Sequence, residues 1–200
     1  GVVAAIQPLH ANPDHNNADV WSRNVGPERE SRGFAWRLIE NAGGRIAFGS
    51  DWPVVTPDVF RGLYCAVARK TREGTPAGGW QPQLAVSAES ALRNYTIDAA
   101  WAGFAEKERG SIAVGKRADL VVLARDVLSG PPEEILGTKV LLTLLGGTTA
   151  GRARPAGPGA APPRALRRRR DALCRALPRL RAALGTGSPP PLGRAARLDR

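Results

Sequence analysis

Residues 45–54 read Arg-Ile-Ala-Phe-Gly-Ser-Asp-Trp-Pro-Val, and this stretch decides how the chain is expected to fold. The apolar run that ends at Gly49 is typical of a short strand that is buried on both faces. Residues 2–8, Val-Val-Ala-Ala-Ile-Gln-Pro, have the same character. A helix predicted over 27–41 lies between the two strands, and a further helix over 58–70 follows the second. Strand–loop–helix units in this order predict an α/β fold with parallel strands.

Candidate functional residues lie in the loops that follow these two strands. Asp51 comes directly after the second strand, and His10 begins a polar, turn-rich loop after the first. In folds built from parallel strands, these loops carry the chemistry. A carboxylate at Asp51 can bind a divalent metal and accept a proton from metal-bound water. The alternative is an aspartate that caps its own turn, which is common before proline.

The other polar and aromatic candidates are weaker. A lone loop histidine such as His10 is more often exposed and idle than catalytic, and His15 is a weaker candidate still. The spacing of these two histidines is not a metal-binding motif. Trp52 and Trp80 could line a pocket, although aromatic side chains more often belong to a core. The residues by themselves leave these alternatives open.

The character of the sequence changes after about residue 105. Before that point, Ser87 is a candidate N-cap of a helix, and a second helix is predicted over 97–104. After it, short apolar runs around Gly-containing turns predict three strands, at 110–115, 118–124 and 139–145. A small β-module is therefore expected after the α/β region.

The basic charge of the chain is confined to its last 50 residues. Residues 151–200 hold 13 of the 29 Lys and Arg residues and 2 of the 18 acidic residues, which accounts for the whole net charge of +11. The Arg/Ala/Pro/Gly-rich composition predicts a low-complexity tail that is disordered or loosely helical. The arginine run 167–170 could bind phosphates, although a solvated charge run is commoner. A shift of reading frame near Gly147 in GC-rich coding DNA would also produce this composition.

Cysteine content and hydropathy constrain the cellular setting only weakly. Cys65 and Cys174 match no disulfide or zinc spacing, so reduced thiols and a cytoplasmic location are expected. No apolar stretch approaches the roughly 18–20 residues of a membrane-spanning helix. The chain opens at Gly1 in an apolar run and contains no Met, and we interpret it as the C-terminal part of a longer protein.

Five segments, taken in order along the chain, resemble amidohydrolase family 3. This is the branch of the metal-dependent amidohydrolases that is similar to N-substituted formamide deformylase. The resembling segments are 5–10 (Ala-Ile-Gln-Pro-Leu-His), 49–54 (Gly-Ser-Asp-Trp-Pro-Val), 91–100, 104–123 and 138–147. The resemblance ends at Gly147.

The resemblance implies an α/β fold whose three parts differ in kind. Residues 1–105 would be the C-terminal part of a (β/α)8 barrel, namely its last two strands and helices. Residues 106–150 would be the C-terminal strands of a small composite β-sandwich, and residues 151–200 would lie outside both. Asp51 would be a metal ligand and the general base, while His10 and Trp52 would contact the substrate. The implied cofactor is a divalent metal, expected to be zinc, and the implied substrate is a small amide-type molecule.

The rest of such a site is absent from this sequence. In the family, the other metal ligands precede barrel strand seven, which residues 2–8 would form. This chain alone is therefore expected to be inactive and to need the N-terminal barrel half for stability. The intact parent would hydrolyse carbon–nitrogen bonds other than peptide bonds. A different class of function remains as the alternative, in which a noncatalytic relic binds nucleic acid or another polyanion through the arginine-rich tail. Membrane association is not expected, and nucleic-acid binding is the less favoured reading because residues 1–150 carry no net charge.

Overall fold

The computed structural model describes residues 2–152. The predictions for the basic tail and for Cys174 lie outside the described residues and stay predictions. The described residues belong to one compact unit, and the boundary expected between residues 105 and 106 also stays a prediction. Within the described range, no helix combines the length and the hydropathy that crossing a bilayer requires.

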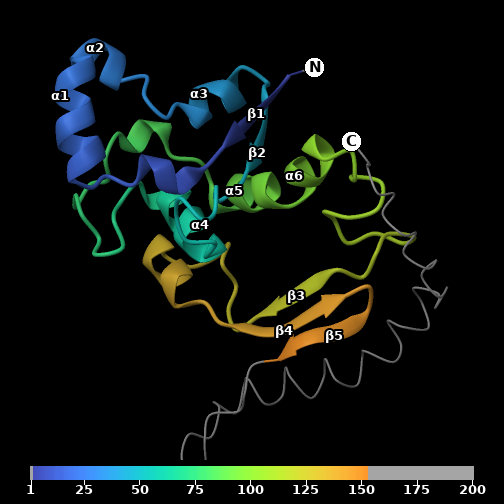
Figure 1. Cartoon of the computed structure of the whole chain (residues 1–200). Coiled ribbons are helices and arrows are strands. Elements are labelled where there is room, and N and C mark those ends of the chain that lie inside the picture. The colour runs from blue at the N-terminus through green and yellow to red at the C-terminus, as the bar shows by residue number, and fades with distance from the viewer. Residues whose placement is uncertain (1, 153–200) are drawn as a thin grey trace, which may run out of the picture. The chain divides into compact units, whose positions relative to one another are not determined.

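Two short parallel strands carry the first part of the fold, as predicted. Strand β1 (Val3–Ile6) pairs with β2 (Arg45–Phe48), with Val3 opposite Arg45 and Ile6 opposite Phe48. Figure 1 shows the two strands side by side, with helices along their length. Within residues 2–152 neither strand has a second neighbour. Both outer edges therefore keep backbone groups that a further strand would pair.

The connection from β1 to β2 is more helical than the sequence indicates. The polar loop expected from His10 to Asn17 is partly helical, and five short helical segments lie between the two strands. These are a 3-10 turn at Pro8–Ala11, a π-helical segment at His15–Trp21, α1 (Ser22–Val25), α2 (Pro27–Glu30) and α3 (Trp36–Asn41). Asp14 begins the helical run, since its Oδ1 accepts hydrogen bonds from the backbone N–H of Asn16 and Asn17 at 3.0 and 3.2 Å. This N-cap is hidden in the sequence because it stands among other turn-forming residues.

The single helix predicted over 27–41 is wrong, because aromatic packing interrupts it. Phe34 lies between α2 and α3 with a positive φ of 53°. Its ring centroid is 5.2 Å from that of Trp21 and 5.7 Å from that of Trp80. Gly33 lies directly against the Trp21 ring, where a Cβ atom would clash. Tertiary contacts of these rings therefore override the helical propensity of the segment.

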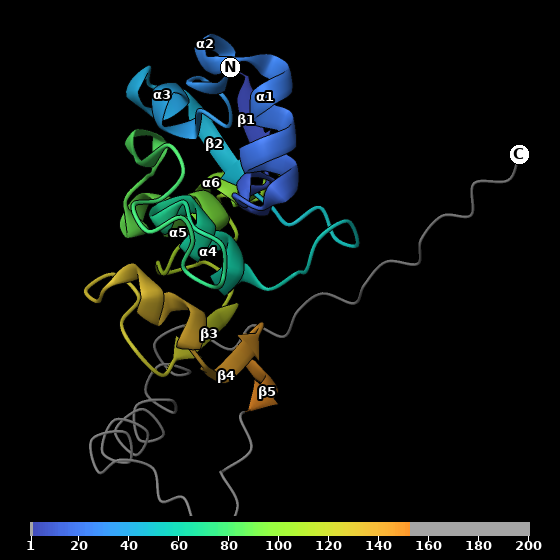
Figure 2. The same cartoon turned by 90° about the vertical axis from the view of Figure 1, so that its left-hand side faces the viewer.

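The three helices that follow β2 agree with the predictions. They are α4 (Val59–Ala68), α5 (Ala88–Tyr95) and α6 (Ile97–Ala102). Asp58 caps α4 by accepting from Phe60 N at 3.0 Å. Ser87 caps α5 as expected, since its Oγ accepts from Ser90 N at 3.1 Å. Figure 2 shows α4, α5 and α6 between the β1–β2 pair and an antiparallel sheet formed by residues 120–152.

The hydrophobic core lies where these helices meet β2. Its buried members include Trp36, Ile46, Phe48, Leu63, Tyr64, Ala66, Trp80, Val86 and Ala91. Arg69 is also fully buried, with its guanidinium carbon 4.5 Å from the centroid of the Trp36 ring and 5.3 Å from that of Trp80. Burial lowers the pKa of Arg69 to about 10. The aromatic rings and the carbonyl oxygen of Trp80, 3.0 Å from Nε, take the place of a carboxylate partner.

A three-stranded antiparallel sheet forms the second part of the fold. Its order is β3–β4–β5, with β3 at Leu120–Leu123, β4 at Val140–Leu145 and β5 at Thr148–Arg152. The first two confirm the strands predicted at 118–124 and 139–145. The strand predicted at 110–115 is wrong, because this segment is irregular and leaves Ile112 and Val114 exposed.

The third strand of this sheet was missed by the sequence analysis. Gly146 and Gly147 have φ values of 56° and 78°, the positive angles that a two-residue type I′ hairpin turn requires. The pair therefore turns the chain back, and β5 runs antiparallel to β4. A Gly-Gly pair after an apolar run is a hairpin signal, and its use here would have predicted β5.

We expect Gly62→Ala to destabilise the chain, although alanine is the better helix former. Gly62 lies inside α4, and the position of an added Cβ atom is occupied by Oη of Tyr95 from α5. On an exposed helix the change would stabilise by about 1 kcal/mol. Here the methyl group must displace Tyr95, whose ring packs 5.3 Å from that of Phe48. Urea unfolding followed by circular dichroism should show a loss of about 1–3 kcal/mol.

The matched variant for this prediction is Gly62→Ala combined with Tyr95→Phe. Removing Oη relieves the closest contact, so the double variant should be more stable than the two single effects added together predict. A gain in stability from Gly62→Ala alone would show that the two helices are not in close contact.

Candidate functional site

The two strand ends bring His10 and Asp51 together. His10 Nε2 lies 3.5 Å from Asp51 Oδ2. The parallel register explains the approach, since Ile6 and Phe48 are opposite each other and both chains continue from the same edge. Residues 41 positions apart in the sequence therefore share one place at the carboxyl ends of the strands.

Neither of these two atoms is committed elsewhere in the described part of the chain. The distance of 3.5 Å is longer than a well-formed hydrogen bond. His10 Nε2 is buried and has no hydrogen-bond partner among the described residues. The side chains as a whole are 33% and 50% exposed. An imidazole nitrogen and a carboxylate oxygen in this arrangement can both face one small ligand.

The backbone of Asp51 holds its side chain toward His10. Asp51 has a positive φ of 57°, a conformation that aspartate tolerates better than most residues. Its carbonyl oxygen accepts a hydrogen bond from Val54 N at 2.8 Å, which closes a turn. Ser50 Oγ accepts from Trp52 N at 3.3 Å in the same turn. The turn is thus held by a carbonyl and a hydroxyl, whereas the Asp51 carboxylate faces His10.

A second polar side chain fixes the position of His10. The backbone N–H of His10 donates to Gln7 O at 3.0 Å within the 3-10 turn. Asn17 Nδ2 donates to His10 O at 2.9 Å and to Asn12 O at 2.8 Å, which ties the loop to the helical segment. Asn17 was not predicted as a functional residue, because an asparagine in a polar loop carries no local signal of such a bridge.

The remaining candidate residues, Trp80, Trp52 and His15, differ in their burial and contacts. Trp80 is buried in the aromatic cluster, and its Nε1 donates to Glu30 Oε1 at 3.1 Å, so the core reading of Trp80 is confirmed. Trp52 follows Asp51 with a side chain that is 67% exposed, and its contact with a substrate stays a prediction. His15 forms an ion pair with Asp19 at 3.0 Å on its own helical segment.

The side chains at this site suit a divalent metal in type but not in number. Imidazole nitrogen and carboxylate oxygen are both common zinc ligands. Among residues 2–152, however, no three His, Cys, Asp or Glu side chains gather closely enough to hold a metal ion. Cys65 offers no further ligand, because burial raises the pKa of its thiol to about 12 and its Sγ donates to Pro8 O at 3.1 Å. The described residues thus offer an imidazole and a carboxylate, which are fewer ligands than a metal site needs.

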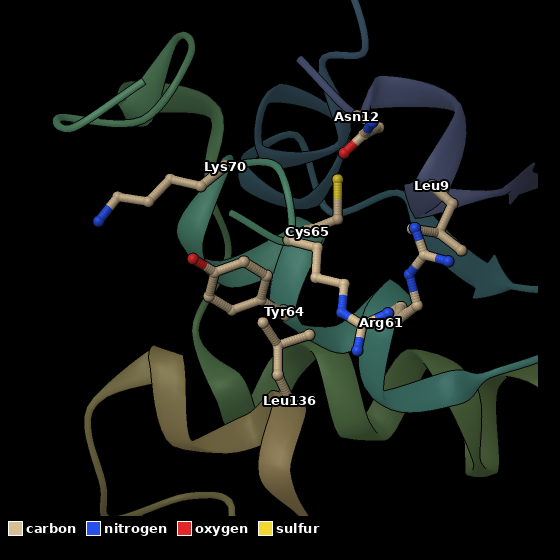
Figure 3. Close-up of a pocket in the computed structure, with 8 residues that line it drawn as sticks. Leu9, Asn12, Arg61, Tyr64, Cys65, Lys70 and Leu136 are labelled. Carbon is tan, nitrogen blue, oxygen red and sulfur yellow. The ribbon is translucent and has the colours of Figure 1, made fainter. Parts of the chain in front are cut away.

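Two hollows lie against the helix α4 and the loop that carries His10, and only the larger one also reaches the loop that follows Asp51. The larger has a volume of about 270 Å³ and is lined by Leu9, Asn12, Asp14, Val55, Thr56 and Arg61. The smaller, drawn in Figure 3, shares Leu9, Asn12 and Arg61 with it. The figure shows the thiol of Cys65 pointing toward Asn12 and the Arg61 side chain next to Leu9.

Comparison with known proteins finds matches over most of the chain. A sequence model of the amidohydrolase family matches residues 1–150, three residues beyond the point where the resemblance was expected to stop. The chain is 40% identical over 114 residues to N-substituted formamide deformylase of Arthrobacter pascens, which covers 57% of this chain and 20% of that protein. It is 32% identical over 147 residues to protein LONG AFTER FAR-RED 3 of Arabidopsis thaliana, which covers 73% of this chain and 24% of that protein.

A solved structure described as an uncharacterized metal-dependent hydrolase from Pyrococcus furiosus is also similar. It has 27% sequence identity and a TM-score of 0.44, and the match covers 58% of this chain and 22% of that one. The chain spans about a fifth to a quarter of the length of the curated relatives that it matches.

Proposed function

The chain belongs to the amidohydrolase family, and on that premise we propose that it is the C-terminal part of a metal-dependent hydrolase. The parent enzyme would act on carbon–nitrogen bonds other than peptide bonds, in small amide-type molecules. The observation that carries this proposal is the approach of His10 Nε2 to Asp51 Oδ2 at 3.5 Å, at the carboxyl ends of two parallel strands.

Within this proposal Asp51 has two roles. Its carboxylate would be a ligand of the metal and would accept the proton of the hydrolytic water. A divalent cation such as Zn²⁺, when bound, lowers the pKa of a coordinated water to about 7. The left-handed backbone at Asp51 and the turn closed by Val54 N hold the carboxylate in place for both roles.

His10 and Trp52 are proposed to contact the substrate. The buried Nε2 of His10 can donate a hydrogen bond to a carbonyl oxygen, or accept one from the leaving nitrogen, depending on its tautomer. The exposed indole of Trp52 offers an apolar surface beside Asp51 on which an N-substituent can pack. The loop held by Asn17 keeps His10 at its distance from Asp51.

The same proposal assigns the described elements to an incomplete barrel. Strands β1 and β2 and their helices would be the last two units of a (β/α)8 barrel, and β3–β5 would be part of a composite β-sandwich. The parallel pairing and the two unpaired outer edges support this, since a barrel continues at both edges. The remaining metal ligands would come from the rest of the parent, so the 200-residue chain alone is inactive. A cytoplasmic location stays a prediction.

The first test compares the chain with its parent gene. We expect the genomic locus to encode an upstream region in frame, and the whole protein to hydrolyse N-substituted formamides. A chelator should abolish the activity and added Zn²⁺ should restore it, because metal binding supplies the activated water. The 200-residue chain should show no turnover under the same conditions. Undiminished turnover after metal removal, or a locus with a start codon directly before Gly1, would refute the proposal.

A further inference from the structure

Arg61 is an arginine without a partner at the wall of both hollows. It lies in the first turn of α4 and is half-buried. Among the described residues it makes no hydrogen bond and no ion pair. Its guanidinium has five donors, and none of them is used by another residue within 2–152. An anion in the hollow would use them.

The one acidic side chain of the larger hollow is already engaged. Asp14 Oδ1 accepts from the backbone N–H of Asn16 and Asn17, and its Oδ2 accepts from Asn12 Nδ2 at 3.2 Å. Asp14 thus caps its own helical segment and does not pair with Arg61. The other polar groups at this wall, Asn12 and Thr56, are uncharged.

The smaller hollow adds positive charge and no acid. Besides Arg61 it is lined by Lys70 and Arg72, and none of its lining residues is acidic. Lys70 is neutralised by Glu133, with 3.0 Å between Nζ and Oε1. Arg61 and Arg72 are not paired in this way, so where the hollows share their lining two unpaired guanidinium charges stand against the single carboxylate of Asp14.

The hollow also has the right place relative to the proposed site. Leu9 precedes His10 directly, and Val55 and Thr56 follow Asp51 on the second loop. A substrate whose scissile bond lies between His10 and Asp51 can therefore extend between the same two loops toward Arg61. The volume of about 270 Å³ accommodates a small carboxylate-bearing group.

We propose that Arg61 forms a subsite for an anionic group, a carboxylate, at the far end of the substrate. This inference rests on the proposed function for the position of the scissile bond. It narrows the substrate class from amide-type molecules in general to N-acyl compounds that carry an acid. Arginine suits the task, because its planar fork binds both oxygens of a carboxylate at once. Arg61 would act as a specificity-determining residue and would leave the hydrolytic step to Asp51.

The test uses the whole 200-residue chain and needs no turnover. N-formylglycine, as its anion, is titrated at constant ionic strength and followed by NMR shifts of the Asn12 side chain and the Thr56 backbone amide. The uncharged N-formylglycinamide and inorganic phosphate serve as comparison probes. We expect the carboxylate to bind and the amide to bind at least about tenfold more weakly, as the loss of one charge-assisted pair predicts.

Matched variants isolate Arg61 from the general positive charge of the chain. Arg61→Gln should weaken binding of N-formylglycine about tenfold, whereas Arg29→Gln, which removes the same charge from an exposed site, should leave it unchanged. Arg61→Lys should retain part of the affinity for N-formylglycine. This second variant tests the role of Arg61 if Arg61→Gln does not fold. The assignment would be overturned if Arg61→Gln and Arg29→Gln had equal effects, or if the amide bound as tightly as the carboxylate. It would also be overturned if phosphate bound more tightly than the carboxylate, or if no binding occurred at millimolar probe.

If the anion subsite fails this test, the hydrolase proposal still stands. If the hydrolase proposal fails, the binding of the carboxylate at Arg61 can still be measured. Asp51→Asn removes the proposed base but does not touch the hollow, so this variant should bind N-formylglycine as the unmodified chain does. If Asp51→Asn and Arg61→Gln reduced binding alike, the anion would lie at Asp51 and the separate subsite would be rejected.

Discussion

The Asp51→Asn variant of the whole parent hydrolase is expected to lose about 10²–10⁴-fold in kcat, the range that a positioned general base contributes. Asparagine has nearly the same shape as aspartate, so the turn at residues 51–54 should persist. The amide cannot accept the proton of water, and it is a much weaker metal ligand than a carboxylate. The assay compares kcat and metal content of the purified parent and variant.

The control for this prediction is Asp19→Asn. Asp19 is a surface carboxylate on the helical segment after His10, paired with Arg23 at 2.9 Å and with His15 at 3.0 Å. Exposed ion pairs contribute little to stability, so this variant should keep its activity within about twofold. Near-normal turnover of Asp51→Asn would show that Asp51 is only a turn residue, the alternative that its position before Trp52-Pro53 leaves open.

Trp36→Ala is expected to cost the 200-residue chain about 3–5 kcal/mol of its free energy of unfolding. Trp36 is the largest fully buried side chain. Its ring lies 6.1 Å from that of Phe48 in an edge-on arrangement, and the Arg69 guanidinium covers it at 4.5 Å. Removal of the indole leaves a cavity and also exposes a buried cation that has no carboxylate partner. Urea unfolding followed by far-ultraviolet circular dichroism measures the change.

Trp52→Ala provides the matched control for Trp36→Ala. The same side chain is removed, but Trp52 is 67% exposed and packs against no other aromatic ring among the described residues, so the expected loss is below about 0.5 kcal/mol. The loss of unfolding free energy for Trp36→Phe should lie between the losses for Trp36→Ala and Trp52→Ala. Trp36→Phe should also remain folded if Trp36→Ala does not. Similar losses at Trp36 and Trp52 would mean that the core is not organised around Trp36.

Local patterns predicted the elements that position the site. The two apolar runs that end at Pro8 and Gly49 became parallel strands, because uninterrupted apolar runs must be buried on both faces. The predicted N-cap at Ser87 is present, because its side chain satisfies one of the first backbone N–H groups of α5. These features depend on residues within a few positions of one another.

Strand β5 was missed although the Gly146-Gly147 pair signals a hairpin, but the other errors lie where contacts from distant parts of the chain decide the backbone. The predicted helix over 27–41 breaks at Phe34 because Trp21 and Trp80 hold that ring. Trp52 and Trp80 look alike in the sequence, yet one is exposed and the other is buried beside Arg69. The segment 110–115 alternates as a strand does but has no neighbouring strand within residues 2–152.

The sequence alone determined that Asp51 and His10 each follow a buried strand, because strand and turn formation depend on short stretches of residues. Only the tertiary structure decided that His10 Nε2 lies 3.5 Å from Asp51 Oδ2, that Asn17 holds the loop of His10, and that Arg61 faces a hollow without an acidic partner. Each of these relations joins residues from different elements. Their distances follow from the register of β1 on β2 and from the packing of α4, which no local pattern specifies.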